Sequence, residues 1–305
     1  MATSTRKSAW LARPPAHAHS PATGVSPGRR AWRRLRRNPT AVAAATVLGF
    51  LVIVAVAGPR VARIDPYRQN LRDSLLPPGT EGHPLGTDHL GRDLLLRLVD
   101  GARVSLLMGC IAVAVAVVIG GLVGLLAGYF GGGLDAVLMR LMDVQLTFPS
   151  LLAALVIVTV LGSGLTNVMI AVGLASVPRF ARVVRGSVLV AKHQAFVEAA
   201  RSVGASDARI MFRHIAPQVM GPVITLATLG LANAILAGAS LSFLGLGPQP
   251  PTAEWGLMLA DGRKYLGTAW WLGVFPGFAI MVAVLAINLL GDGLRDARDP
   301  DGDRA

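Results

Sequence analysis

The sequence predicts an all-α integral membrane protein with six transmembrane helices. Of its 305 residues, 53% are hydrophobic and only 15% are charged, whereas a soluble domain averages about 25% charged residues. The mean hydropathy is +0.56. The apolar residues form six runs of the length that a helix needs to cross a bilayer, roughly 17–25 residues. The six runs are residues 41–57, 104–127, 144–161, 168–184, 219–246 and 270–290.

An even number of spans places both termini on one side, and the basic residues indicate which side that is. If both termini are cytoplasmic, 20 of the 29 Lys and Arg residues fall on the cytoplasmic side and 9 fall outside. Basic residues are enriched in the cytoplasmic loops of membrane proteins. The first outer loop is the exception, but its seven Arg are offset by six acidic residues. The sequence therefore predicts cytoplasmic N- and C-termini.

Residues 1–31 are predicted to form a disordered, basic cytoplasmic tail, because they are polar and show no apolar period. A basic cluster at residues 29–37 stands directly before the first apolar run. Such a cluster can bind nucleic acid. Beside a membrane span it favours anionic lipid instead, so the lipid membrane is the expected partner and nucleic acid is not. The twin arginines and the later Ala55-Val56-Ala57 also resemble a cleaved export signal, but five further apolar runs favour a retained anchor.

Residues 32–100 are predicted to contain the first transmembrane helix and a long outer loop. The end of this loop carries a face of leucines and two pairs of opposite charge at i,i+4 spacing, Asp88 with Arg92 and Asp93 with Arg97. This spacing predicts a short amphipathic helix that lies across the membrane-embedded core.

The polar stretch between the fourth and fifth apolar runs, residues 185–218, is unusually long for a loop between spans. Residues 191–203 are good helix formers, and Gly204 suits the left-handed position that ends a helix. Ser206 and Asp207 suit the start of a second helix, and Pro217 lies near the foot of the fifth span. The stretch is therefore predicted to be two short cytoplasmic helices. From spacing alone, a docking element and a solvated connecting loop remain equal alternatives.

The stretch "EAARSVGASDARIMFRHIAP" resembles the EAA loop of ABC importer permeases, which forms the coupling helix that docks into an ATPase subunit. The family motif falls on Glu198, Ala199, Ala200, Gly204 and Pro217. Within the same loop, the charged side chains expected to take part in coupling are Arg201 and Asp207. The sequence departs from the family at Ala216, where Leu is usual before the closing Pro.

Further stretches resemble the dipeptide, oligopeptide and nickel branch of that family and its C-type chain. They are "HPLGTDHLGRDLLLRL", "GLLAGYFGGGLDAVLMRLMDVQLTFPSLL", "ASLSFLGLGPQPPTAEWGLML" and "LLGDGLRDARDP". The resemblance covers about residues 32–300. It implies a transmembrane permease core at residues 101–295 and a cytoplasmic tail at residues 296–305.

The resemblance also implies the function and the partners. The chain is expected to be the membrane-spanning permease subunit of an ATP-driven importer in the cytoplasmic membrane of a prokaryote. Its expected partners are a B-type permease subunit, two ABC ATPase subunits and an extracytoplasmic substrate-binding protein. The expected cargo is a di- or oligopeptide, or a related small solute such as nickel. Another substrate within the same family is the alternative, because the binding protein does most of the selection.

No catalytic residue, cofactor or metal site is predicted. A Walker A loop needs G-x-x-x-x-G-K-[ST], and none of Lys7, Lys192 and Lys264 stands in that setting. His83 and His89 share the outer loop but have no further ligands in a recognisable spacing. The chain is therefore expected to be a transport subunit and not an enzyme, with ATP hydrolysis on separate subunits.

The rival hypothesis is a free-standing secondary carrier or channel with six spans. Proton-coupled carriers usually need a carboxylate or histidine inside the membrane. The charged residues Asp143, Arg179, Arg182 and Asp292 lie near the ends of the predicted spans. Asn233 lies within a span, where hydrogen bonding between helices is its more common role. The substrate-binding residues are left unassigned by the sequence.

Overall fold

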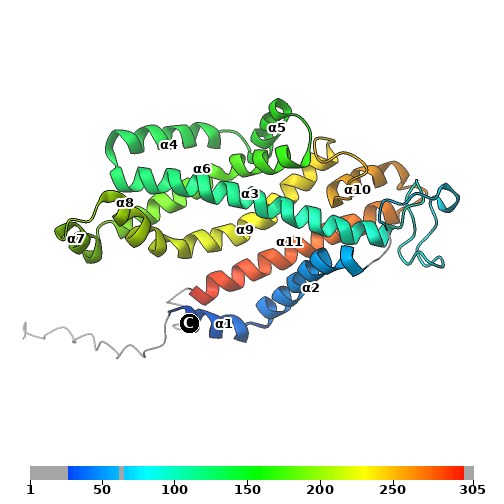
Figure 1. Cartoon of the computed structure of the whole chain (residues 1–305), viewed down its shortest axis with the longest axis horizontal. Coiled ribbons are helices and arrows are strands. Elements are labelled where there is room, and N and C mark those ends of the chain that lie inside the picture. Colours follow the sequence, from blue (N-terminus) through cyan, green and yellow to red (C-terminus); the bar gives the residue numbers. More distant parts are fainter. Residues whose placement is uncertain (1–26, 62–64, 299–305) are drawn as a thin grey trace, which may run out of the picture.

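The computed structural model of the chain describes residues 27–61 and 65–298, and within them every named element is helical. Figure 1 labels the α-helices. They are α1 (Pro27–Arg37), α2 (Pro39–Val61), α3 (Leu94–Phe130), α4 (Gly132–Leu146), α5 (Ser150–Leu161), α6 (Leu165–Ala191), α7 (Ala195–Ser202), α8 (Asp207–Arg209), α9 (Ala216–Phe243), α10 (Trp255–Gly262) and α11 (Trp271–Arg298). Short 3₁₀ turns are found at Leu71–Asp73 and Arg263–Tyr265, and a π-helical turn, η2, at Ile210–Ile215.

Five helical stretches of the described residues are long and apolar enough to cross a membrane, and they contain α2, α3, α6, α9 and α11. The predicted span at residues 144–161 differs, because α4 ends at Leu146 and α5 begins at Ser150 with the two helices bent by 94°. Pro149 disfavours helical backbone at the residue before it, which separates α4 from α5. This predicted span is therefore a bent pair of helices and not a single helix. The count is six only if the bent pair is taken as one span.

The helices α3 and α6 pack closely along a row of glycines on α3. Gly120, Gly124 and Gly128 are spaced four residues apart, and a Cβ added at any of them would collide with α6. At Gly124 that Cβ would lie 2.4 Å from the carbonyl oxygen of Ala181. Small residues at this spacing let two helix backbones approach each other. The α3–α6 pair is therefore a tightly packed part of the bundle.

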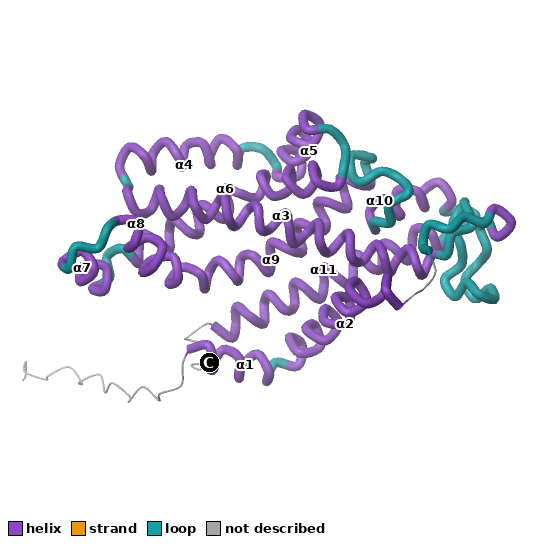
Figure 2. The backbone as a smooth tube through the Cα atoms, viewed as in Figure 1, coloured by secondary structure: helices purple, strands orange, loops and turns teal. Residues whose placement is uncertain are grey.

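The elements are arranged between two ends of an elongated bundle. α1, the C-terminal end of α11 and the α7–α8 segment lie at one end, while residues 65–93 and α10 lie toward the other (Figure 1). Much of the non-helical backbone belongs to residues 65–93 (Figure 2). Gly293 near the end of α11 lies against Ala41 near the start of α2, which holds these two helices together at the first end.

Residues 1–26 and 299–305, which make up most of the two predicted tails, lie outside the described residues. Residues 27–31 of the predicted N-terminal tail belong to α1, and residues 296–298 of the predicted C-terminal tail belong to α11. Pro27 suits the first helical position because its missing N–H has no partner to lose there. The predicted disorder of residues 27–31 is therefore wrong, because these residues are helical.

Candidate functional site

The segment between α6 and α9 is a compact helix–turn–helix at one end of the bundle (Figure 1). α7 ends at Ser202, and Gly204 has a left-handed backbone with φ of +76°. The Gly204 amide donates to the Arg201 carbonyl, and the Ala205 amide donates to the Ala200 carbonyl. These two bonds form a Schellman motif, which commonly ends a helix at glycine. The structure thus has the predicted order of helix, Gly204 and helix.

One face of this segment is buried against the ends of α3 and α6. Its buried side chains are Val197, Ala200, Ile210, Met211 and Ile215. They belong to one apolar cluster with Leu125, Tyr129, Val184, Val188 and Ala191. Removing this much apolar surface from water stabilises the contact. The segment is therefore held as an extension of α3, α6 and α9.

The opposite face of α7 is exposed, and we call it the outer face of α7. Of the predicted coupling residues, it contains Glu198, Ala199, Arg201 and Gly204. Val203 adds an aliphatic side chain that is 84% exposed. Ala200 does not belong to this face, because successive helical residues point about 100° apart and Ala200 is only 8% exposed. Ala200 therefore packs inward, toward the apolar cluster.

Asp207 is exposed, but its carboxylate has a partner on α3. Tyr129 at the end of α3 donates its hydroxyl hydrogen to the Asp207 carboxylate, with 2.5 Å between the oxygens. The Arg201 guanidinium lies over the Tyr129 ring, 5.7 Å from its centre, in a geometry of cation–π attraction. Lys192 adds a bond from its Nζ to the Gly128 carbonyl, at 2.9 Å. These contacts join α7 and the residues on either side of it to the last turn of α3.

The second helix of the segment is continuous with the following span. Asp207–Phe243 is one helical stretch, interrupted by the π-helical turn η2 and not by a loop. The Ala216 amide donates to the Met211 carbonyl, five residues back. Pro217, which is exposed, follows this turn and has no amide hydrogen to donate, a situation that π-helical turns accommodate. Ser206 stands at the N-cap position of α8, but its side chain makes no capping bond.

Two ion pairs join α4 to α6 in the middle of the chain. Arg185 binds Asp135 through two nitrogens, at 2.5 and 2.6 Å. Arg182 binds Asp143 at 2.6 Å. The sequence placed Asp143 and Arg182 near the ends of spans without pairing them. The pairs hold the first arm of the bent α4–α5 unit against α6.

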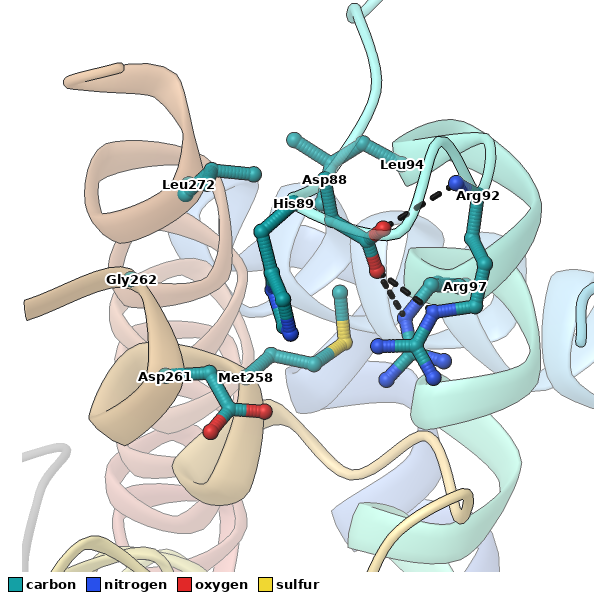
Figure 3. A pocket seen from close by; sticks show the side chains of 9 residues that line it. All are labelled: Asp88, His89, Arg92, Leu94, Arg97, Met258, Asp261, Gly262 and Leu272. Carbon is teal, nitrogen blue, oxygen red and sulfur yellow. Dashed lines mark hydrogen bonds and ion pairs between the residues drawn. The ribbon is translucent and has the colours of Figure 1, made fainter. Parts of the chain in front are cut away.

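A second cluster of charges closes the far end of the bundle (Figure 3). Asp88 accepts a hydrogen bond from Arg92 Nε at 2.6 Å and lies 3.5 Å from Arg97 Nε. All three side chains are buried. The expected Asp88–Arg92 pair therefore forms, but it lies in a turn before α3. Asp93 caps α3 by accepting from the Leu96 amide, and does not pair with Arg97.

The amphipathic helix predicted at this point is thus the first part of α3, which begins at Leu94. Beside it, His89 stacks on Tyr265 with ring centres 5.4 Å apart, and His83 bonds to Asp93 at 2.8 Å. Among the described residues, no three His, Cys, Asp or Glu side chains are grouped as a metal ion would require.

Glu254 is a buried acid that sequence reasoning missed. Its carboxylate accepts hydrogen bonds from the amides of Gly256 and Leu257, at 2.9 and 2.8 Å, and so caps α10. Ser105 on α3 donates to the same carboxylate at 3.2 Å. Burial raises the pKa of Glu254 above its ordinary value of 4.5, although the amide bonds act in the opposite direction. The available signal was an acidic residue directly before an apolar helical run.

Two family models match the chain. The model described as the binding-protein-dependent transport system inner membrane component matches residues 120–301. The model described as the N-terminal TM domain of oligopeptide transport permease C matches residues 26–78.

Curated relatives match nearly the whole chain. It is 43% identical to the dipeptide transport system permease protein DppC of Alkalihalophilus pseudofirmus, over 91% of each protein. It is 46% identical to the di/tripeptide transport system permease protein DppC of Pseudomonas aeruginosa, over 90% of this chain and 92% of the other. It is 47% identical to the glutathione transport system permease protein GsiD of Escherichia coli, over 90% and 91%.

A solved structure matches in fold. A chain of the MetNI methionine ABC transporter, in an inward-facing conformation, has a TM-score of 0.54 and 19% sequence identity. The match covers 67% of this chain and 97% of that one.

Proposed function

Because the chain belongs to the family of binding-protein-dependent transport system inner membrane components, we propose that it is the membrane-spanning subunit of an ATP-driven peptide importer. The observation that carries the proposal is the near full-length similarity, at 43–47% identity, to permeases named for dipeptides, di- and tripeptides and glutathione. All of these cargoes are small peptides, so peptide is favoured over nickel. Another solute of the same family stays the alternative.

The outer face of α7 is the proposed contact with an ATPase subunit. Glu198 and Arg201 offer charge-assisted hydrogen bonds, while Ala199 and Gly204 let a partner's backbone approach. Ala200 and Asp207 position α7 on the bundle, and Pro217 follows the π-helical turn that leads into α9. The burial of Ala200 and the hydrogen bond from Tyr129 to Asp207 support this division of roles.

The proposed topology puts α1, α7 and the end of α11 in the cytoplasm of a prokaryotic cell. The charge distribution of the sequence and the common end of these elements in Figure 1 support this orientation. Residues 65–93 and α10 then face the extracytoplasmic side, where a substrate-binding protein docks. A B-type permease subunit completes the substrate path, and two separate ATPase subunits hydrolyse ATP.

The mechanism we infer is alternating access driven through α7. Closure of the ATPases on ATP displaces the two coupling segments of the permease pair. α7 follows α6 within a few residues and leads through the π-helical turn into α9 without a flexible linker. Displacement of α7 therefore moves α6 and α9 against the neighbouring helices, and so changes the side of the membrane to which the path opens.

Co-purification of the ATPase tests this assignment. The chain is expressed with the transporter subunits encoded beside it, either unchanged or with Glu198→Arg. Reversing this charge in the contact lowers the co-purifying ATPase by about tenfold or more, because attraction becomes repulsion. Glu81→Arg is the matched control, since Glu81 is an exposed glutamate of the far-end segment. Equal ATPase recovery with both variants would refute the proposed role of α7.

A further inference from the structure

A cavity of about 220 Å³ lies between α5, α6 and α9. Its apolar lining comes from Leu, Ala and Val residues of the three helices. Its polar lining consists of Ser150, Ser176, Arg179, Asn233 and Ser240. Complete small-ligand pockets usually have about 300 Å³ or more. The cavity thus has the mixed apolar and polar lining of a ligand site, with a volume below that of most complete ones.

Arg179 is the only ionised side chain among the residues that line this cavity. α6 runs from Leu165 to Ala191, so Arg179 lies about 21 Å along the helix at 1.5 Å per residue. The stretch Leu165–Ala191, which includes Arg179, is long and apolar enough to cross a membrane. The predicted span, residues 168–184, also includes Arg179, near its end. A charged residue within a membrane-spanning helix is commonly functional.

Arg179 has no hydrogen bond or ion pair with any of the described residues. It begins a series of arginines on α6, spaced three residues apart. The next two, Arg182 and Arg185, are each neutralised by an aspartate of α4. α4 ends at Leu146, and α5 carries no acidic residue with which to continue the series. Arg179 is therefore left with an exposed guanidinium facing the cavity.

The chemistry that fits this setting is a carboxylate. A guanidinium binds a carboxylate through two parallel hydrogen bonds. Peptides of different sequence all keep the terminal carboxylate, so one arginine serves every cargo. Asn233 lies across the cavity on α9, and its amide nitrogen donates a hydrogen bond to the Leu229 carbonyl oxygen. Its amide oxygen is free to accept a peptide N–H.

We propose that this cavity is a substrate subsite in which Arg179 binds the terminal carboxylate of the transported peptide. The inference rests on the proposed function, because it takes a peptide as the cargo. α6 and α9 continue toward α7, so the same displacement that α7 transmits changes this subsite. Binding at Arg179 is thereby linked to the conformation of the permease.

Photolabelling tests the subsite in the detergent-solubilised complex, without the binding protein so that its selectivity plays no part. The probes are a radiolabelled dipeptide with a diazirine side chain and the same dipeptide as its C-terminal amide. The free acid is expected to label α5, α6 or α9 at least about tenfold more than the amide, the difference that a charged hydrogen-bonded pair makes. Arg179→Gln should abolish that difference, and Arg179→Lys should restore part of it.

Arg140→Gln is the matched control, because Arg140 is an exposed arginine of α4 outside the cavity. It should label like the wild type. Equal labelling by acid and amide in the wild type, or no labelling of these helices, would overturn the subsite. So would equal losses for both probes in Arg179→Gln, the result expected if Arg179 instead pairs with an acid of the second membrane subunit. ATP-driven uptake by the wild-type complex, measured in parallel, reports separately on the proposed function.

Discussion

Glu254 and Arg179 are two charged side chains of this protein that differ in burial and in hydrogen-bond partners. Glu254 is fully buried, and amides of Gly256 and Leu257 satisfy its carboxylate. Arg179 is exposed to a cavity and has no bonded partner among the described residues. A buried acid with bonds to its own helix stabilises local structure, whereas an unpaired charge within a candidate membrane span is available to a ligand. The first is therefore a stability residue and the second a binding residue.

The raised pKa of Glu254 predicts how stability changes with pH. An acid whose pKa is higher in the folded state than in the unfolded state stabilises the fold. This stabilisation is fully present below the ordinary pKa of 4.5 and is lost as the pH rises through the folded-state pKa. Glu254→Gln removes the titration and keeps an oxygen that accepts one amide bond. The difference in apparent melting temperature, variant minus wild type, should therefore increase as the pH is raised from 4.5 toward neutrality. A difference that is independent of pH would contradict this assignment.

Some residue roles could be read from the sequence and others could not. Gly204 was predictable because a left-handed helix terminus has a strong local preference for glycine. The inward position of Ala200 depends on which face of α7 meets α3 and α6, and the pattern E-A-A does not state that. Asp207 does begin α8, as predicted, but the hydrogen bond that its carboxylate accepts from Tyr129, 78 residues away in the chain, was not predictable. Such long-range contacts leave no local signal.

At the scale of elements, the contact between α3 and α6 depends on three glycines whose hydrogens face the opposing backbone. A side chain there forces the helices apart, and overpacking of this kind typically costs about 1–3 kcal/mol. The bend between α4 and α5 and the length of α6 also have local causes. Pro149 separates α4 from α5, and continuous helical backbone carries α6 well beyond its apolar core.

Two neighbouring glycines of α3 provide a matched test of this packing. A Cβ at Gly124 would lie 2.4 Å from the Ala181 carbonyl oxygen, whereas a Cβ at Gly121 meets no atom within 4 Å. Gly124→Ala should lower the apparent melting temperature of the purified complex. Gly121→Ala should leave it unchanged or raise it, because Ala favours helix over Gly by about 1 kcal/mol. Similar behaviour of the two variants would argue against a close α3–α6 contact.

Helix existence was far more predictable than helix limits. Hydropathy located α2, α3, α6, α9 and α11, because each must bury its backbone bonds in apolar surroundings. Hydropathy could not show that the expected amphipathic helix is the first part of α3, because charged residues near the end of a helix do not interrupt its backbone. For the same reason it did not show that the α6 helix continues to Ala191.

At the scale of the molecule, the two ends carry different chemistry. One end has the exposed outer face of α7 with the basic α1 nearby, and the other has the buried cluster of Asp88, Arg92 and Arg97 that secures the start of α3. The cavity with Arg179 lies along the helices between them. Hydropathy, charge counts and the resemblance together predicted this general arrangement. The cavity needed the structure, because it arises where three separate helices meet.

Uptake of a labelled dipeptide into proteoliposomes tests the central claim that ATP drives transport through this chain. Vesicles contain the purified permease pair with its ATPases, and the binding protein is supplied outside with the peptide. The account predicts uptake that requires ATP inside the vesicles, persists with a protonophore and stops when the ATPase subunits are omitted. Uptake by the membrane subunits alone, abolished by the protonophore, would contradict it and identify a secondary carrier.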